Sequence, residues 1–534
     1  MTFPHQFGRW RKQAVGFAGS LFAIALSSVA QPKAGDLVFQ TDFEGAGTLH
    51  AWGAEQDQNV RLAPGYQSAQ SLQVEKQTNT TGSASVHFAL PIDKMRGARL
   101  ACRAMVRADG VTPPPQPWNG IKFMLHITTP NGALWPQQNN LSGTFDWKRV
   151  QFKATIPPDA TAAELILGLE AVTGRAQFDD LKITVTHGPR MRPATPPAGP
   201  VFTGHAEPRL RGAMISPDLT PESLRVLGQE WNANLIRWQL IRYGPSGRIN
   251  TAAGYDAWLE GALVKLDAAL PLCEKYGMRV VLDLHSPLGG APTAGGYVGS
   301  DTGLFTNRTA QDKFVADWER MARRYRDSSV IWGYDLVNEP VEDEVAEGCD
   351  DWQALATRAA RAVRAADTRH AIIVEPTPWG GPEALANLEP LPVPGVVYSV
   401  HMYLPHQFTH QGVFSGPTGI AYPGLIEGKL WDQAALRRVL QPVRDWQRDY
   451  GVQIYLGEFS AIRWAPNDSA YRYLKDCIAL FEEFGWDWSY HAFREWSGWS
   501  VEHAQDQADT APSKTQTSRE KLLREWYGKN LKAK

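Results

Sequence analysis

Cysteine is scarce in this chain, with four in 534 residues. No two of them have the CxxC spacing typical of a zinc site or a redox motif. Their spacing also leaves any disulfide pairing undetermined. Cys273 and Cys477 fall in helical patterns, where we expect buried free thiols, and neither they nor Cys102 and Cys349 are assigned a function.

An excess of charge of either sign is also missing. The chain has 54 basic and 56 acidic residues, a formal net charge of −2. This balance gives no electrostatic reason to expect nucleic acid or an anionic membrane surface as a partner. Tryptophan, by contrast, is abundant at 20 residues. Exposed tryptophan faces commonly hold sugar rings, so this count mildly favours a carbohydrate ligand.

Only one long apolar run is present, at residues 14–26, and it is shorter than the ~20 residues that a membrane-spanning helix needs. Basic residues at 9–12 precede it, and small residues at 28–30 follow. This pattern predicts a signal peptide over residues 1–30, with cleavage near Ala30 and export to the periplasm or the medium. An uncleaved anchor is the alternative, and the mature form is expected to have no membrane partner.

Residues 36–187 show short alternating segments with glycine and proline between them, which predicts an all-β sandwich. The expected strands are 72–76, 85–90, 99–105, 120–126, 147–153, 163–168 and 176–185. The first and last segments, 39–44 and 178–183, resemble the ends of jelly-roll carbohydrate-binding modules. Trp52, Trp118 and Trp135 either form a sugar platform on this module or belong to its core.

Residues 188–206 contain five prolines and no periodic pattern, so they are predicted to form a linker. From 207 to 530, apolar strands alternate with amphipathic helices, which indicates βα units and a parallel sheet. The expected strands are 210–214, 233–239, 278–285, 330–337, 370–375, 395–403, 452–459 and 486–493. Helical patterns fall between them, for example at 255–276, 311–326, 353–366 and 432–449.

Eight strands in about 320 residues predict a (β/α)8 TIM barrel. A doubly wound open sheet is the alternative, but the first strand is not followed by a glycine-rich phosphate loop. Catalytic residues of barrels lie where strands end. Polar side chains occupy these positions on five strands: Arg237, His285, Asn338 with Glu339, His401 with Tyr403, and Glu458.

Two of these side chains are carboxylates, Glu339 after the fourth strand and Glu458 on the seventh. Hydrolysis of a glycosidic bond needs two such groups, one to protonate the leaving oxygen and one to attack or to activate water. Strands four and seven face each other across the barrel mouth. The ~5–5.5 Å separation of the retaining mechanism is therefore attainable.

Five short motifs occur in the order and at the strand positions of a known family: Asn234-Leu-Ile-Arg237, Leu282-Asp-Leu-His285, Asn338-Glu-Pro340, His401-Met-Tyr403 and Gly457-Glu458. Together they resemble glycoside hydrolase family 5, the cellulase-type barrels of clan A. The resemblance covers residues 207–530. It implies a retaining glycosidase that acts through a covalent glycosyl-enzyme without a cofactor or metal.

The same resemblance implies a role for each motif residue. Glu339 matches the acid/base and Glu458 the nucleophile. Asn338 would hold the sugar 2-hydroxyl, and Arg237 would keep Glu458 ionised, because a nearby cation lowers a carboxyl pKa. Tyr403 would also hydrogen-bond Glu458.

The remaining positions are less clearly defined. His401 would flank Glu339, and His285 would contact sugar in the −1 or −2 subsite. The family usually places a tryptophan after strand eight, where Trp496 is our choice and His491 the rival. Trp379, after strand five, is expected to be an additional platform.

Two other classes of protein remain as alternatives. A catalytically silent barrel that only binds glycans would not need both glutamates. A metal-dependent hydrolase would need ligand clusters such as His-x-His on the first strand, and residues 210–214 contain none. The expected partner is a β-linked oligo- or polysaccharide, cellulose-like or another β-glucan or mannan, with endo or exo action left open.

Overall fold

The structure is a computed structural model that describes residues 31–532, except 79–80, 131, 190–198, 243–250, 290–302, 343–344, 347 and 414–415. The predicted signal peptide and the central part of the predicted linker lie outside these described residues. The chain divides into two compact units, Met1–Pro189 and Arg190–Lys534. Among the described residues, none of the helices has the length and apolar character required to cross a bilayer.

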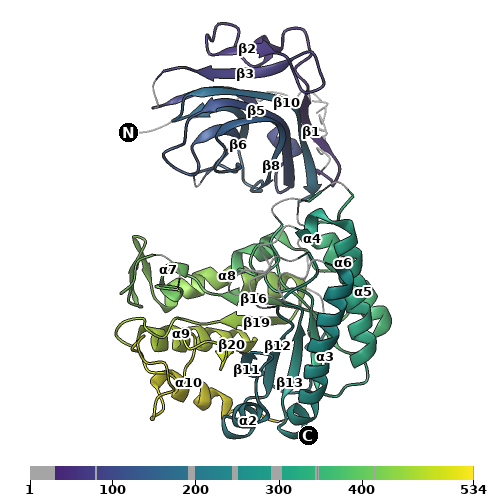
Figure 1. The fold of residues 1–534 in the computed structure, drawn as a ribbon, viewed down its shortest axis with the longest axis vertical. Helices are drawn as coiled ribbons and strands as arrows, with labels where there is room; N and C mark the ends of the chain where they lie inside the picture. The colour runs from purple at the N-terminus through teal and green to yellow at the C-terminus, as the bar shows by residue number, and fades with distance from the viewer. Residues whose placement is uncertain are drawn as a thin grey trace, which may run out of the picture. The chain divides into compact units, whose positions relative to one another are not determined.

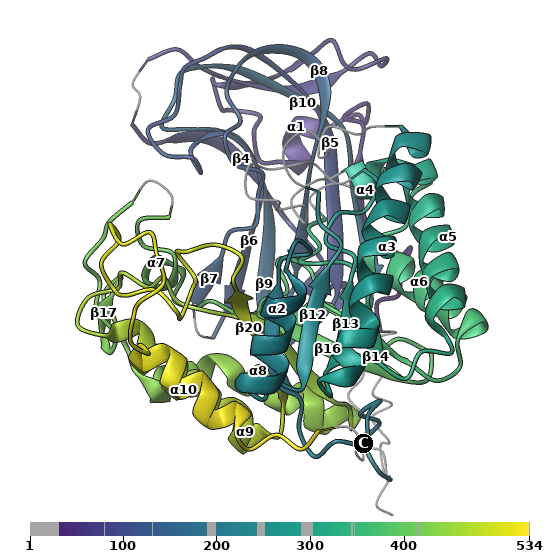
Figure 2. The same ribbon diagram turned by 60° about the horizontal axis from the view of Figure 1, so that its bottom comes forward.

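The N-terminal unit consists of two antiparallel sheets, seen in Figure 2. One sheet has the order β2-β3-β10-β5-β8, with β1 beside β10, and the other has the order β4-β9-β6-β7. The strands are β1 Leu37–Thr41, β2 Val60–Ala63, β3 Ser71–Lys76, β4 Ser83–Ala89, β5 Arg99–Val111, β6 Gly120–Thr129, β7 Gly132–Leu134, β8 Gly143–Thr155, β9 Ala162–Glu170 and β10 Gly174–His187. All seven predicted strands are therefore present. The jelly-roll assignment stays a prediction.

Alternation along each strand explains how the two sheets share one core. In β6, Ile121, Phe123 and Leu125 join the core between the sheets, whereas Lys122 and Met124 point to the other face. Trp52 is also a core residue, only 5% exposed, and packs against Phe39, Phe43 and Phe88. Of the three tryptophans considered for a sugar platform, only Trp118 and Trp135 are exposed.

The C-terminal unit is a closed barrel of eight parallel strands, which confirms the predicted barrel and excludes the open sheet. Its strands are β11 Arg211–Ile215, β12 Leu235–Gln239, β13 Arg279–Asp283, β14 Ile331–Asp335, β15 Ala371–Val374, β16 Val396–Met402, β19 Ile454–Phe459 and β20 Asp487–Phe493. Each predicted strand contains the observed one, or differs from it by a single residue at its ends.

Helices surround the barrel: α2 Pro221–Arg225, α3 Ala252–Lys275, α5 Arg308–Tyr325, α6 Trp352–Ala366, α8 Gln433–Tyr450, α9 Ser469–Phe484 and α10 Ser518–Tyr527. Figure 1 shows α3, α5 and α6 side by side on one flank. Asn307, Asp351 and Asp432 cap the N-termini of α5, α6 and α8, and in each case the side-chain oxygen accepts a backbone N–H of the first turn.

Shorter elements fill the connections: α1 Thr48–Ala51, α4 Gly303–Thr306, α7 His406–Thr409, β17 Gly424–Ile426 and β18 Lys429–Trp431. The end of the predicted linker packs on the barrel. Trp332 donates a hydrogen bond to the Thr203 carbonyl at 2.8 Å, and His205 Nε2 lies 3.1 Å from Asp487 Oδ2.

The four cysteines are free thiols, and Cys102, Cys273 and Cys477 are buried.

Candidate active site

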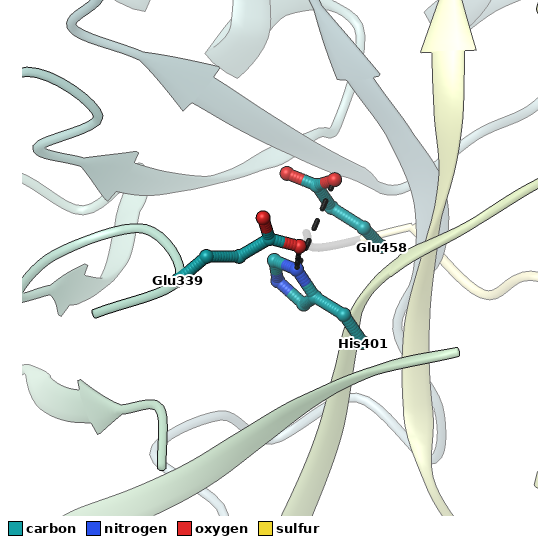
Figure 3. A group of neighbouring side chains, drawn as sticks. All are labelled: Glu339, His401 and Glu458. Carbon is teal, nitrogen blue, oxygen red and sulfur yellow. Dashed lines mark hydrogen bonds and ion pairs between the residues drawn. The ribbon is translucent and has the colours of Figure 1, made fainter. Parts of the chain in front are cut away.

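Glu339 and Glu458 meet at the barrel mouth together with His401, as Figure 3 shows. Glu339 follows strand β14, His401 lies in β16 and Glu458 lies in β19. One ligand-type atom from each of these three side chains lies within 4.8 Å of the other two. All three side chains are buried. The structure therefore brings the two predicted carboxylates together.

A β-bulge sets the direction of Glu458. Val400 pairs with Leu456, but the next residue of β16, His401, pairs with Glu458, so Gly457 is an extra residue in β19. A Cβ at Gly457 would lie 2.6 Å from Ser399 Oγ and 2.9 Å from His401 Nε2. Glycine is thus required by the close approach of β16, and the bulge aims Glu458 at the mouth.

Glu339 has a left-handed backbone conformation, with φ 44°. Its backbone N–H donates a hydrogen bond to Glu375 Oε2 at 2.8 Å, and its carboxylate Oε1 lies 2.7 Å from His401 Nδ1. A non-glycine residue in this region of φ/ψ space is strained and is usually held by its surroundings. Here Glu375 and His401 hold the backbone and the side chain of Glu339.

Arg237, fully buried in β12, is the centre of the charge network. It donates to Glu458 Oε1 at 2.6 Å, to Glu375 Oε1 at 2.9 Å, to Asn338 Oδ1 at 3.0 Å and to Asp335 Oδ2 at 3.0 Å. Burial alone would lower the pKa of Arg237, but the surrounding carboxylates raise it well above its usual value. The guanidinium is therefore permanently charged.

The pKa of Glu458 responds to the same network. Burial raises this pKa, but the positive charges of His401, His491 and Arg237 outweigh burial and lower it well below the usual carboxyl range. Glu458 is consequently ionised at neutral pH. This is the protonation state that a nucleophile requires.

His401 lies between acidic groups. Its Nε2 is 3.1 Å from Glu375 Oε1, and its Nδ1 is 3.8 Å from Glu458 Oε2. Burial disfavours the charged ring, but Glu375, Glu458 and Glu339 outweigh burial and raise the pKa of His401 well above its usual value. His401 is therefore a cation in contact with Glu339.

Tyr403 and His491 cover the other oxygen of Glu458. The Tyr403 hydroxyl donates to Glu458 Oε2 at 2.8 Å and lies 2.5 Å from His491 Nδ1. His491 Nε2 lies 3.1 Å from Glu495 Oε2. Burial lowers the pKa of His491, but Glu458 and Glu495 raise it above its usual value.

His285 is buried two residues after strand β13, and its Nδ1 lies 2.7 Å from Asp283 Oδ2. Asp283 in turn lies 3.3 Å from Arg237 Nη2. The structure thus joins Arg237, His401 and Tyr403 to the carboxylate pair by direct contacts, Asn338 through Arg237, and His285 through Asp283 and Arg237.

Residues 205–502 match the family described as Cellulase (glycosyl hydrolase family 5), and this match spans more than half of the 534 residues. The chain belongs to glycosyl hydrolase family 5. The family 5 domain coincides with the closed barrel and contains every residue of the site. The resemblance stated from the sequence is therefore confirmed for the barrel.

Two relatives are similar over part of the chain. Endoglucanase C of Acetivibrio thermocellus is 28% identical over 263 residues, which cover 43% of this chain and 73% of the relative. Cellodextrinase A of Ruminococcus flavefaciens is 26% identical over 242 residues, which cover 45% of this chain and 70% of the relative. A solved structure described as a glycoside hydrolase has 25% identity and a TM-score of 0.49, covering 60% of this chain and 99% of that one.

The two tryptophans predicted as platforms of the family 5 site lie on its loops with exposed rings. Trp496 follows strand β20, is 41% exposed and packs edge-on against Trp464 and Trp499. Trp379 follows β15 and is 42% exposed. The rival of Trp496, His491, lies within β20 and contacts Tyr403. Contact of either tryptophan with sugar stays a prediction.

Sequence reasoning missed three buried carboxylates of this family 5 site: Asp283, Asp335 and Glu375. Glu375 ends the predicted fifth strand, so the strand-end criterion that selected Glu458 also applies to it. Asp283 lies two residues before His285 and has the same inward alternation. Asp335 carries no comparable signal, because it precedes the Asn338-Glu339 pair inside an apolar strand.

Glu339, His401 and Glu458 could together hold a metal ion by spacing alone. Two features of the site favour proton chemistry instead. The guanidinium of Arg237 already neutralises Glu458 at 2.6 Å and would repel a divalent cation there. A histidine must be neutral to bind a metal, whereas the raised pKa of His401 favours the imidazolium.

Proposed function

We propose that the barrel hydrolyses β-glycosidic bonds with retention of configuration, with Glu339 as acid/base and Glu458 as nucleophile. The observation that carries this proposal is the approach of one oxygen of Glu339 to within 4.8 Å of one oxygen of Glu458. Retaining glycosidases hold their two carboxyl groups ~5–5.5 Å apart, whereas inverting enzymes separate them by ~6.5–9.5 Å to admit a water molecule.

The different surroundings of the two glutamates support their different roles. Arg237 and Tyr403 both donate to Glu458, which favours its ionised form. The carboxylate of Glu339 lies against His401 instead. Two carboxyl groups with such different neighbours have the asymmetry that an acid and a nucleophile require.

The reaction then has two steps. Glu458 attacks the anomeric carbon while Glu339 gives its proton to the leaving glycosidic oxygen, which forms a glycosyl ester on Glu458 and releases one sugar product. Glu339, now ionised, takes a proton from water, and the resulting hydroxide attacks the anomeric carbon and frees Glu458. Asn338, whose side-chain oxygen accepts a hydrogen bond from Arg237, would bind the sugar 2-hydroxyl through its amide.

The substrate class that we propose is a β-linked glucan of the cellulose type. The names of the two relatives, an endoglucanase and a cellodextrinase, support this class. A β-mannan is the second candidate, and His285, Trp379 and Trp496 are the residues that we expect to contact sugar. Export after cleavage of residues 1–30 is part of the proposal, because polymeric glucans lie outside the cell.

The test is sugar release from β-1,4-glucan, mixed-linkage β-glucan, β-mannan, xylan and aryl β-glycosides. We expect the wild type to act on at least one of them and Glu458→Gln to lose at least about 10⁴-fold in kcat. Glu389→Gln, on an exposed surface position, is the matched control and should retain full activity. A silent barrel is the conclusion if the folded wild type releases no sugar from any of them.

Two further measurements address the mechanism. Proton NMR of the first product should show the β-anomer, and an initial α-anomer would contradict retention. Prolonged treatment with EDTA should leave kcat unchanged. Loss of activity on chelation, with recovery on addition of a divalent cation, would instead assign Glu339, His401 and Glu458 to a metal.

A further inference from the structure

A pocket lies in the N-terminal unit, far along the sequence from the family 5 residues. Its volume is about 540 Å³, within the range of ordinary ligand sites. Lys122 lines the pocket, and its neighbours in β6, Ile121 and Phe123, point into the core. Because side chains alternate along a strand, the pocket lies on the outer face of the sheet β4-β9-β6-β7. Other lining residues are Trp118, Trp135, Gln137, Asn139 and Glu170.

Two tryptophans on this pocket expose about half of their surface, 54% for Trp118 and 51% for Trp135. The Trp135 ring stacks on His126 with centroids 4.0 Å apart and planes 5° apart. One ring face is thus fixed by the protein, and the ring is held in place before any ligand binds. Large exposed aromatic surfaces next to a pocket mark ligand sites more often than unused surface.

The floor of the pocket is polar and has no net charge. Lys122 is buried, and its Nζ donates to the Trp118 carbonyl at 2.5 Å and to Gln137 Oε1 at 3.1 Å. The same Nζ lies 2.5 Å from Glu170 Oε2, which also accepts from Asn119 at 2.9 Å. A buried lysine is disfavoured unless it is paired, so this ion pair is built into the sheet.

These features together specify the chemistry of the ligand. Because Lys122 and Glu170 neutralise each other, the floor favours neither an anion nor a cation. Amide and carboxylate groups of Gln137, Asn139 and Glu170 match hydroxyl groups, which both donate and accept hydrogen bonds. The two indole rings match the C–H faces of pyranose rings, since the aromatic face carries partial negative charge.

We propose that this pocket is a second glycan-binding site, which holds a neutral β-linked oligosaccharide against Trp118 and Trp135. The site lies wholly within the N-terminal unit, so its binding does not depend on the barrel. The identity of the sugar as the same β-glucan that the barrel hydrolyses rests on the proposed function.

The test uses the full chain carrying Glu458→Gln, which prevents hydrolysis during the measurement. Isothermal titration with cellohexaose, and separately with mannohexaose, should show two binding events per chain with at least one of the two sugars. Adding Trp118→Ala and Trp135→Ala should remove one event, or weaken it at least about tenfold. The matched control is Trp147→Ala, a half-buried tryptophan on the opposite sheet, which should keep both events.

The proposal is overturned if the parent binds neither sugar, or if the double variant binds as the parent does. A single event that the double variant loses would support the N-terminal site and count against binding by the barrel. Circular dichroism and thermal melting of each variant establish that the N-terminal sheets remain folded. With active Glu458, the double variant should hydrolyse aryl β-glycosides at the wild-type rate. This rate depends on the barrel alone. Hydrolysis of aryl β-glycosides therefore tests the proposed activity, and the titration of the double variant tests the second site.

Discussion

The two ends of the barrel interior differ sharply in chemistry, although the same strands build both. One layer further from the mouth lies a buried apolar cluster that includes Leu235, Val281 and Ile373. Two residues further along each of these strands the inward side chain is ionisable: Leu235 is followed by Arg237, Val281 by Asp283 and Ile373 by Glu375. One step of the β alternation therefore separates a layer that stabilises the fold from a layer that carries charge.

The two layers contribute to the free energy of folding with opposite sign. Burial of the apolar layer is favourable at about 25 cal/mol per Å². The charged layer must be desolvated, and its ion pairs at best offset that penalty. The charged layer is therefore explained by chemistry at the mouth, and the apolar layer below it by stability. Substitutions in matched pairs along one strand can test this division.

Arg237→Met is expected to have the largest effect. It removes the cation that touches Glu458 and Glu375 and leaves buried carboxylates uncompensated. We expect a loss of about 3–5 kcal/mol in the free energy of unfolding of the barrel, together with loss of hydrolysis. Urea denaturation and kcat/KM measure the two effects. Arg237→Lys, which keeps the charge, should recover part of both, and an unchanged unfolding midpoint for Arg237→Met would contradict the central role of this cation.

Leu235→Ala tests the apolar layer on the same strand. The side chain is fully buried, and we expect a loss of about 2–5 kcal/mol in the free energy of unfolding, because a cavity remains. In contrast to Arg237→Met, the surviving folded enzyme should keep its kcat and its pH profile. A displaced pH profile in Leu235→Ala would show that the two layers are not independent.

The division between these layers was partly predictable from the sequence. Apolar strands with polar ends predicted the barrel. The polar ends also predicted Glu339, Glu458, Arg237 and His401 as site residues. The bulge at Gly457 was not predictable, because a strand sequence does not reveal the pairing register of its neighbour.

Burial was the other quantity that the sequence left open. Trp52 and Trp118 look alike in a sequence, and only the packing of the two sheets places the first in the core and leaves the second exposed. Similarly, Glu375 contacts Arg237, His401 and the backbone of Glu339. These residues belong to three other βα units, so the sequence around Glu375 does not reveal the contacts.

Glu375→Gln should have an intermediate effect. Glutamine has nearly the same shape, but it removes the negative charge beside His401 and weakens the hydrogen bonds to Arg237 and the Glu339 backbone. We expect kcat/KM to fall about 10–100-fold. Glu375 is one of the groups that raise the pKa of His401, so this pKa should fall, which an NMR titration of the His401 ring measures. Glu389→Gln, the same chemical change at an exposed position, serves as the charge control. A lower rate with an unchanged pKa of His401 would assign Glu375 a purely structural role.

His491→Gln is expected to have the smallest effect, mainly on pH dependence. Ionised Glu458 is needed for attack, so kcat/KM falls as the pH drops through its pKa. Burial raises this pKa, and the charged His491 is one of the cations that lower it. Removing His491 therefore raises the pKa of Glu458 and moves the acid limb toward neutral pH, while kcat at the optimum changes less than about tenfold.

The control for this last experiment is His50→Gln, an exposed histidine of the N-terminal unit that should leave the profile unchanged. Tyr403 still donates to Glu458 in the variant, so the geometry of the nucleophile is retained. An acid limb that stays in place in His491→Gln would mean that Arg237 and His401 alone keep Glu458 ionised. The charged layer would then end at those two cations, and His491 would belong to the part of the mouth that contacts sugar, as the rival of Trp496.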